Sequence, residues 1–419
     1  MKKRGLMSIV VILILGLVGC SDNEIISTTS KGGNEKIPIK IWMSEEEYAQ
    51  ALIEGINEKF PHIDVTFEKV AEGEASSKLE LDGPAGLGAD IVFQTQESMA
   101  KSFQSTILLP VGSDLTSYIE ENMLEAAIYS VLSDGTMYGA PVSVESLALF
   151  YNKTLLDENN FEVATSFEQL MEDAQSYNDF KTNKFLLRFE PWNTYTAYLF
   201  LSAAGFELFG PNGQNPDLVN LDTQAAVEGL YSFKEYQQYL PIPSKDLSWD
   251  TVHGEFVKGE VPYMINGPWA IAEVKEAAKL NNFEWGIKTL PTINGSQPRP
   301  FLGNIVASIS AYTQYPDQAR EVLSYIVSDE GLKIMYDTLA KLPALSDPTV
   351  IDGIKEDPYI MGVNAQVQMA NPMPMLGELS YFYEAADIMF QLVWDGLLTP
   401  EEAIEKAIKD YNMAIDITK

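Results

Sequence analysis

Residues 37 to 69 read IPIKIWMSEEEYAQALIEGINEKFPHIDVTFEK, and two periodicities of apolar residues follow one another in this stretch. Apolar residues alternate in 37–43 and again at Ile63, Val65 and Phe67, which predicts two strands. Between them, apolar residues recur at helical spacing from Leu52 to Phe60, and Pro61 ends the predicted helix. Strand, helix and strand within about thirty residues form a βαβ unit, which implies a right-handed crossover and a parallel strand pair.

The same alternation continues outward from this unit. Ala89 to Phe93 is a short apolar run typical of a buried parallel strand, and Thr165 to Gln169 has capping-box residues that begin a helix. Further strands are predicted at 259–266 and 283–287, and further helices from 221 and at 317–327, 331–339, 383–394 and 400–413. Because strands and helices alternate nearly throughout, the predicted fold class is α/β.

Length and charge limit the classes of function. The chain has 419 residues, enough for two domains, with 28 Lys and Arg against 60 Asp and Glu and a formal net charge of −32. Nucleic-acid affinity depends largely on neutralisation of phosphates by Lys and Arg, so no nucleic-acid partner is expected. After residue 20, no apolar run approaches the roughly 18 residues that a membrane-spanning helix needs.

The first twenty residues predict export and a lipid anchor. Met1-Lys-Lys-Arg4 is cationic, and an apolar run follows from Ile9 to Val18, which is the layout of a signal peptide. Leu17-Val-Gly-Cys20 resembles a bacterial lipobox, and Cys20 is the only cysteine, so it has no disulfide partner within the chain. We expect residues 1–19 to be a signal peptide and residues 20–36 to be a lipidated cysteine with a polar, flexible tether at the outer face of the cell membrane. An ordinary signal peptide with an incidental cysteine is the alternative.

Metal, phosphate and nucleophile motifs are absent from the sequence. His62 and His253 are the only histidines, and neither has metal-ligand spacing with another His or Cys. The run from Gly83 to Gly88 lacks the spacing of a dinucleotide-binding loop and reads as a turn before the strand at Ala89–Phe93. No Gly-x-Ser-x-Gly elbow occurs. We therefore expect no metal site, no cofactor and no catalytic residue.

Carboxylates beside exposed aromatic residues are the remaining feature. Glu190 stands in Phe-Glu-Pro-Trp192, Trp269 follows Asn-Gly-Pro, Glu145 lies in an apolar segment, and Glu97 follows the Phe93 strand. A Pro or Gly turn exposes a neighbouring Trp ring. Rings of this kind pack on the apolar face of a sugar, while carboxylates accept hydrogen bonds from its hydroxyls. Any one of these residues alone is more often structural, and the same carboxylates also suit a glycosidase.

Several segments, in order along the chain, resemble the extracellular solute-binding proteins of ABC importers, in particular the maltose/maltodextrin-binding group. These segments are Lys40-Ile-Trp42, Ala89–Phe93, PVSVESLALFYNK (141–153), YMINGPWA (263–270), Leu290-Pro-Thr292, Pro300-Phe-Leu-Gly303 and Ser328-Asp-Glu-Gly-Leu332.

The resemblance implies a type II periplasmic-binding-protein-like fold, with two discontinuous α/β lobes joined by a hinge. It implies that residues 37–143 and 304–343 form lobe 1 and residues 144–303 and 344–419 form lobe 2. The chain would pass between the lobes at Val142–Leu149, Pro300–Val306 and Leu342–Ser346, which places Glu145 at the floor of the cleft.

The resemblance also implies ligand contacts by position. Glu145, Glu190, Trp192 and Trp269 match family contacts, with Trp192 replacing a family Tyr. Glu97 and, more loosely, Glu46 match family Asp residues, and Tyr383 stands where the family has a stacking Trp. In one departure, the family pattern has a Trp where this chain has Gln94, and Thr95 and Gln96 replace further family residues. One stacking platform is therefore missing, so maltose itself is not assumed.

Together these observations predict a monomeric lipoprotein that binds an α-linked, maltodextrin-like oligosaccharide and delivers it to the permease of an ABC transporter. A binding protein for a peptide, a polyamine or a metal complex is an alternative, and a secreted glycoside-active enzyme is a second. Turnover of a labelled oligosaccharide would identify the enzyme. Lack of a fluorescence response to any sugar would identify the other binding proteins.

Overall fold

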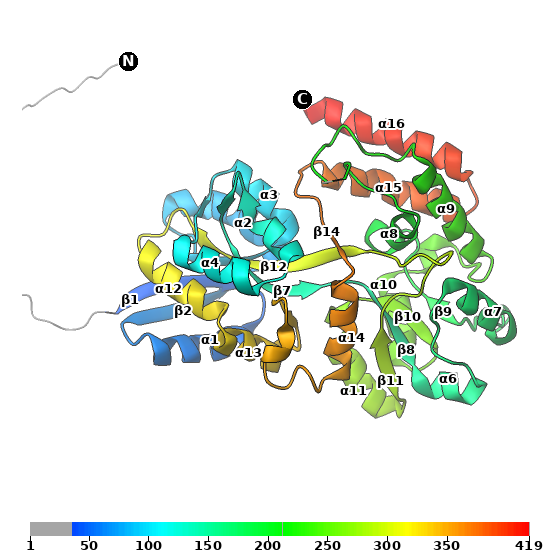
Figure 1. The fold of residues 1–419 in the computed structure, drawn as a ribbon, viewed down its shortest axis with the longest axis horizontal. Helices are drawn as coiled ribbons and strands as arrows, with labels where there is room; N and C mark the ends of the chain where they lie inside the picture. The colour runs from blue at the N-terminus through cyan, green and yellow to red at the C-terminus, as the bar shows by residue number, and fades with distance from the viewer. Residues whose placement is uncertain (1–35, 212, 419) are drawn as a thin grey trace, which may run out of the picture. The chain divides into compact units, whose positions relative to one another are not determined.

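The computed structural model describes residues 36–211 and 213–418. The predicted signal peptide, Cys20 and all of the predicted tether except Lys36 lie outside the described residues. The described chain forms an eight-stranded sheet, a four-stranded sheet and a two-stranded hairpin made of β5 (Leu132–Ser133) and β6 (Thr136–Met137). Figure 1 shows the strands of the two larger sheets, each accompanied by helices.

The eight-stranded sheet contains the predicted βαβ unit. Its central order is β13-β7-β12-β3-β1-β2, and β4 and β14 also pair with β12. Strand β1 pairs with β2 in parallel from Ile37↔Ile63 to Met43↔Lys69, which confirms the prediction from residues 37–69. The strands are β1 (Ile37–Met43), β2 (Ile63–Lys69), β3 (Ile91–Thr95), β4 (Leu108–Leu109), β7 (Ala140–Glu145), β12 (Phe301–Ser310), β13 (Leu342–Pro343) and β14 (Asn371–Pro372).

Helices cover both faces of this sheet. Because β1 lies between β3 and β2 and all three are parallel, right-handed crossovers place the first two helices on opposite faces. The first helix packs with α12 and α13, and the second packs with α3, and Figure 1 shows these as two separate groups. The helices are α1 (Glu46–Lys59), α2 (Glu72–Asp82), α3 (Gln96–Gln104), α4 (Ser113–Asn122), α5 (Glu125–Ile128), α12 (Pro316–Ile326) and α13 (Asp329–Leu339).

The four-stranded sheet has the order β11-β8-β10-β9. Its strands are β8 (Ala148–Asn152), β9 (Leu187–Arg188), β10 (Tyr263–Asn266) and β11 (Trp285–Lys288). The helices of this part of the chain are α6 (Lys153–Asn159), α7 (Phe167–Tyr177), α8 (Thr194–Ala203), α9 (Gln224–Gln237), α10 (Trp249–Val257), α11 (Ile271–Asn281), α14 (Pro358–Val367), α15 (Leu379–Trp394) and α16 (Pro400–Thr418).

The predicted capping box at the start of α7 is confirmed. The Ser166 hydroxyl accepts a hydrogen bond from the backbone N–H of Gln169 at 3.1 Å, and the Gln169 side chain accepts one from the backbone N–H of Thr165 at 3.0 Å. These bonds satisfy backbone donors that a helix N-terminus otherwise leaves unpaired. The predicted strands and helices of the C-terminal half are also present as β10, β11, α12, α13, α15 and α16.

The described chain passes repeatedly between the two sheets. Strand β7 of the larger sheet ends at Glu145, and β8 of the smaller sheet begins at Ala148, so only two residues separate the sheets there. The segment from β11 to β12 makes the return passage. Residues 342–346 still form backbone hydrogen bonds with residues beside the larger sheet, such as Val142. Helix α14, which follows, packs on β11 of the smaller sheet. A further passage therefore lies after Ser346 and not at 342–346, where the resemblance implied it.

Large aromatic side chains anchor the core. Trp42 is fully buried, donates its indole N–H to a Glu68 carboxylate oxygen at 2.8 Å, and has the Lys78 ammonium 4.7 Å from its ring centroid. Phe233 and Trp394 pack at 5.1 Å between ring centroids where α9 meets α15. Among the described residues, no helix has the length and apolar character needed to cross a membrane.

Candidate ligand-binding site

Glu145 lies where the chain leaves the larger sheet. It is half-buried at the end of β7 and pairs in register with Gly303 of β12. A Cβ on Gly303 would lie 2.7 Å from Cγ of Glu145, so the glycine leaves room for the carboxylate side chain. Burial raises the pKa of Glu145, Lys341 opposes this shift, and the carboxylates of Glu97 and Glu72 add to it.

Two tyrosines connect Glu145 and Glu97 to helices beside the smaller sheet. Tyr195 lies in the first turn of α8, and burial raises its pKa well above the usual value, with the charges of Glu145 and Glu97 adding to the shift. Tyr383 of α15 shows the same direction of pKa shift from burial, with Tyr195 and Glu97 adding to it. Within the described chain, the Tyr383 hydroxyl has no hydrogen-bond partner. Because the charges of these residues influence one another's pKa, we group Glu97, Glu145, Tyr195 and Tyr383 and call them the cluster.

Trp269 joins the cluster through Tyr195. The two ring centroids are 6.3 Å apart, and the Trp269 side chain remains 43% exposed. The ring follows β10 in the short 3-10 helix Pro268–Ala270, and a Cβ on Gly267 would lie 2.1 Å from it. A side chain at position 267 would therefore collide with the Trp269 ring. The exposure of Trp269 that its Gly-Pro turn predicts is observed.

Glu190 and Trp192 lie between β9 and α8, just before Tyr195. Both are half-buried, and the Trp192 indole N–H donates to the carbonyl of Leu247 at 3.1 Å. Burial raises the pKa of Glu190 to about 7, although hydrogen bonds from the backbone of Trp249 and the side chain of Asn193 oppose the shift. The described contacts do not join Glu190 or Trp192 directly to Glu145.

Glu46 stands apart from the other predicted contacts. It is exposed in the first turn of α1, and no described interaction ties it to the cluster. Its neighbour Ser44 does approach the cluster, because the Ser44 hydroxyl donates to Glu72 at 2.7 Å and Glu72 contributes to the pKa shift of Glu145.

The polar residues that depart from the family pattern point into the protein. Gln94 is fully buried in β3, where its side chain bonds Ser308 at 3.2 Å and Ser102 at 2.9 Å. Gln96 is also buried and donates to the carbonyl of Leu302 at 2.7 Å. These side chains pack the interior and do not offer a stacking surface.

Tyr195 is the residue that the sequence reasoning missed. Asn193 caps α8 by accepting the backbone N–H of Tyr195 at 3.0 Å, which places Tyr195 in the first turn. The sequence did offer one signal for Tyr195. It lies three residues after Trp192, where Asn193 marks a recognisable helix start. That signal predicts a helix N-terminus but does not indicate which distant carboxylates lie beside it.

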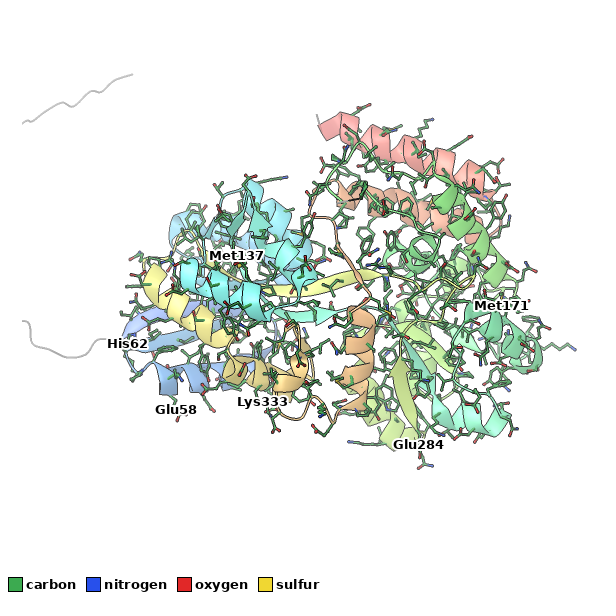
Figure 2. The ribbon with its side chains drawn as sticks, in the orientation of Figure 1. Glu58, His62, Met137, Met171, Glu284 and Lys333 are labelled. Atoms are coloured by element: carbon green, nitrogen blue, oxygen red, sulfur yellow. The ribbon has the colours of Figure 1, made fainter. Side chains whose placement is uncertain are left out.

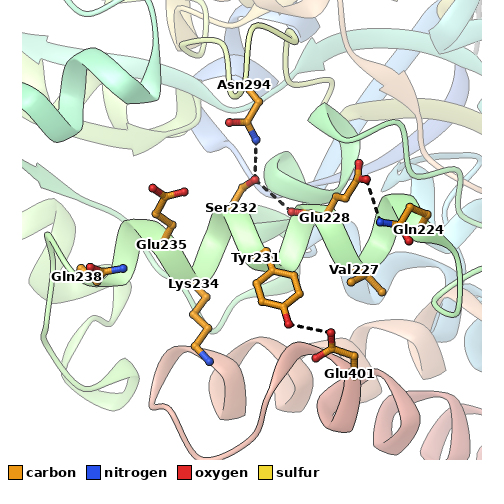
Figure 3. Close-up of a pocket in the computed structure, with 10 residues that line it drawn as sticks. All are labelled: Gln224, Val227, Glu228, Tyr231, Ser232, Lys234, Glu235, Gln238, Asn294 and Glu401. Carbon is orange, nitrogen blue, oxygen red and sulfur yellow. Dashed lines mark hydrogen bonds between the residues drawn. The ribbon is translucent and has the colours of Figure 1, made fainter.

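A pocket of about 790 Å³ lies elsewhere, along α9 and the start of α16 (Figure 3). It shares no residue with the cluster. Tyr231, its single aromatic residue, donates to Glu401 at 2.8 Å, and Asn294 donates to Ser232 at 2.9 Å. Most of its lining residues belong to α9 or directly follow it, and Asn294 and Glu401 are the two that come from other segments.

Both histidines have carboxylate partners. His62, labelled in Figure 2, stands just before β2. Its Nε2 lies 3.1 Å from a Glu321 carboxylate oxygen, and Nε2 of His253 lies 2.8 Å from one of Glu273. In the described part of the chain, no group of three or more His, Cys, Asp or Glu residues is placed to hold a metal ion.

The sequence matches a known protein family and several known relatives. The family model described as bacterial extracellular solute-binding protein matches residues 51–399. A maltodextrin-binding protein of Bacillus subtilis is 29% identical over 385 residues, covering 90% of this chain and 88% of the relative. A maltooligosaccharide ABC transporter solute-binding lipoprotein of Streptococcus pneumoniae is 25% identical over 405 residues, covering 93% and 91%.

A solved structure agrees with these sequence matches. The cyclo/maltodextrin-binding protein complexed with maltotetraose superposes with a TM-score of 0.82 at 28% identity, covering 92% of this chain and 98% of that one. This likeness confirms the predicted two-lobe, type II α/β fold. Since the family model spans most of the sequence, the chain belongs to the family of bacterial extracellular solute-binding proteins.

Proposed function

We propose that this protein captures an α-linked, maltodextrin-like oligosaccharide outside the cell and delivers it to the permease of an ABC transporter. The observation that carries the proposal is the cluster with Trp269, in which the Tyr195 ring lies beside Trp269 and the charges of carboxylates from the larger sheet and α3 act on Tyr195. The names of the relatives from Bacillus subtilis and Streptococcus pneumoniae support the same class of ligand.

The chemistry of the cluster suits a neutral sugar. An aromatic ring packs on the apolar C–H face of a sugar unit, while a carboxylate accepts hydrogen bonds from neighbouring hydroxyls. Trp269 offers an open ring, and Glu145 and Glu97 offer acceptors. The free hydroxyl of Tyr383 adds a donor within the described cluster.

The origin of these residues suits a binding protein that closes on its ligand. Glu145 and Glu97 belong to β7 and α3 beside the larger sheet, whereas Tyr195, Trp269 and Tyr383 belong to elements beside the smaller sheet. A sugar that contacts both groups stabilises the arrangement in which they approach, which is a population shift toward the closed form. In this proposal the protein performs no chemistry on the sugar.

We propose Glu97, Glu145, Glu190, Trp192, Trp269 and Tyr383 as ligand contacts, with Tyr195 added from the structure and Glu46 as an outer contact. Membrane attachment through a lipid on Cys20 and a monomeric state are part of the same proposal. The lipoprotein relative from Streptococcus pneumoniae supports the anchor. A tether of this kind raises the effective concentration of the binding protein at its permease.

Titration of the purified protein, followed by tryptophan fluorescence, tests the proposal. The panel contains α-linked glucose di- to hexasaccharides, their β-linked counterparts, a β-galactobiose and spermidine. We expect saturable binding of the α-linked series, with the sugar recovered intact by chromatography. Binding of spermidine alone would contradict the ligand class, and release of shorter sugars would contradict the absence of chemistry.

A further inference from the structure

Lys341 comes directly before β13, the strand at one edge of the larger sheet. Strand β13 pairs antiparallel with β7, and Leu342 stands opposite Val144. One position further along, Lys341 on one strand meets Glu145 on the other. Residues that stand opposite each other in an antiparallel pair project their side chains to the same face. Lys341 is therefore a cross-strand neighbour of Glu145.

The other neighbour of Glu145 has no side chain. Strand β7 lies between β13 and β12, and Glu145 pairs with Gly303 of β12. A Cβ at Gly303 would crowd the Glu145 side chain, so β12 leaves this space to the carboxylate. Of the two positions that flank Glu145 across the sheet, Lys341 is the one that carries a charge.

The charge of Glu145 depends on this lysine. Burial, neighbouring charges and hydrogen bonds are the three causes that shift the pKa of a carboxyl group. Burial raises the pKa of Glu145, and the charges of Glu97 on α3 and Glu72 on α2 raise it further. In the described chain, no hydrogen bond lowers this pKa, and the Lys341 ammonium is the one group that does. Tyr195, which acts on Glu145 from α8, stays neutral because burial raises its own pKa well above the usual value.

The Lys341 ammonium has no other partner. The side chain is half-buried, and none of the described carboxylate oxygens lies within 4.0 Å of its Nζ. Lys341 and Glu145 both belong to the larger sheet, so they stay together when the elements beside the smaller sheet move. An ionised carboxylate accepts charge-assisted hydrogen bonds from hydroxyls, whereas a protonated carboxyl group loses this strength.

We propose that Lys341 is a positioning residue of the ligand site, which keeps the adjacent Glu145 carboxylate ionised so that it accepts hydrogen bonds from sugar hydroxyls. This inference rests on the proposed function and deepens it. It predicts that Lys341 determines the pH range in which the protein binds its sugar.

Isothermal titration with an α-linked trisaccharide, repeated from acidic to mildly alkaline pH, tests the proposal. Acidification protonates Glu145 and weakens binding. Lys341→Met removes the opposing cation, so we expect its loss of affinity to begin about one pH unit higher than in the unaltered protein. Lys341→Arg keeps the cation and should follow the unaltered profile. Lys355→Met, which removes an exposed cation from the loop before α14, is the matched control and leaves the profile unchanged.

A second comparison isolates Glu145 from Glu190, whose pKa of about 7 lies in the same range. Lys341→Met is made in Glu145→Gln protein, whose amide does not titrate and still offers a carbonyl acceptor. We expect the shift of the profile to disappear in this background. An equal shift in both backgrounds, no shift in either, or an Arg variant that behaves like the Met variant would overturn the inference. If the unaltered protein bound no sugar at any pH, the proposed function would fail before any variant was compared, and the role of Lys341 with it.

Discussion

The ring of Tyr195 lies 6.3 Å from the ring of Trp269, at an interplanar angle of 48°. Tyr195 belongs to the first turn of α8, and Trp269 follows β10, so the pair joins two segments that are distant in the sequence. Tyr195 is also close enough to Glu145 and Glu97 for their charges to raise its pKa. This pair therefore connects the open ring of Trp269 to the carboxylates on the other sheet.

Replacing Trp269 by Ala removes the most exposed ring of the candidate site. Stacking of an aromatic ring contributes on the order of 1 kcal/mol, and loss of buried apolar area adds to this, so we expect sugar affinity to fall about tenfold. Isothermal titration with an α-linked disaccharide measures the effect, and Tyr231→Ala is the control with a similar exposed ring. Unchanged affinity of the Trp269 variant for every sugar would remove this residue from the site.

Replacing Gly303 by Ala displaces Glu145 without deleting it. The new Cβ would lie 2.7 Å from Cγ of Glu145, so the carboxylate side chain has to shift while the β12 backbone stays paired with β7. We expect sugar affinity to fall several-fold and the midpoint of thermal unfolding to fall as well, because the clash is with Cγ near the backbone end of a half-buried side chain. Gly73→Ala is the control, because a Cβ there meets no atom within 4 Å. Normal affinity in the Gly303 variant would argue against Glu145 as a contact.

Stability should fall as pH rises because of Glu190. Burial raises the pKa of folded Glu190 to about 7 from its usual value of 4.5, so the stabilisation is complete below about pH 4.5 and is lost as pH rises through 7. Glu190→Gln stays neutral, and we expect it to be more stable than the unaltered protein at pH 8, by on the order of 1 kcal/mol after discounting for solvent screening. The two should be equally stable at pH 4.5. Urea unfolding at both pH values measures this, and a constant difference would contradict the assignment.

The ion pair of Arg188 and Glu255 is the most deeply buried in the described chain. The Arg188 side chain is 1% exposed, with Nε 2.5 Å from a Glu255 oxygen, and its NH2 group also donates to the carbonyl of Asn183 at 3.1 Å. Glu255→Ala leaves this cation buried without its partner, and we expect a loss of about 3–5 kcal/mol in the free energy of unfolding.

Substituting both partners should cost less than this single change. In Arg188→Met with Glu255→Leu, no charge remains buried, so the free energy of unfolding should lie closer to that of the unaltered protein. Chemical denaturation of the three proteins measures the comparison. A double variant that is less stable than Glu255→Ala would show that the charges themselves stabilise the fold.

Attachment to the membrane should depend on Cys20, which lies outside the described residues. We expect Cys20→Ala protein to move from the membrane fraction to the soluble fraction and to lose incorporation of labelled fatty acid. Sugar affinity should be unchanged, because the candidate site begins well after the tether. Variant protein that remains with the membranes after a high-salt wash would contradict lipid anchoring at this residue.

Local periodicity predicted much of the fold. The alternating residues of 37–43 appear as β1, and the helical spacing from Leu52 to Phe60 appears as α1, whose buried face packs near β2 and α13. Helix α2 was not predicted, since Ala75, Ser76 and Leu79 are its only buried residues and make no apolar stripe. Strand β12 was anticipated only in part, as a crossing segment, although it pairs with β3, β4, β7 and β14.

The sequence by itself therefore determined the α/β class, the start of α7 and the exposure of Trp269, because each depends on neighbours within a few residues. Only the tertiary structure decided that the charges of Glu145 and Glu97 act on Tyr195, and that Gln94 faces inward. The faces of a strand buried on both sides look alike in sequence, so the direction of a side chain such as Gln94 depends on packing. The meeting of distant carboxylates and rings depends on strand order and on the passages between the two sheets, which no local periodicity encodes.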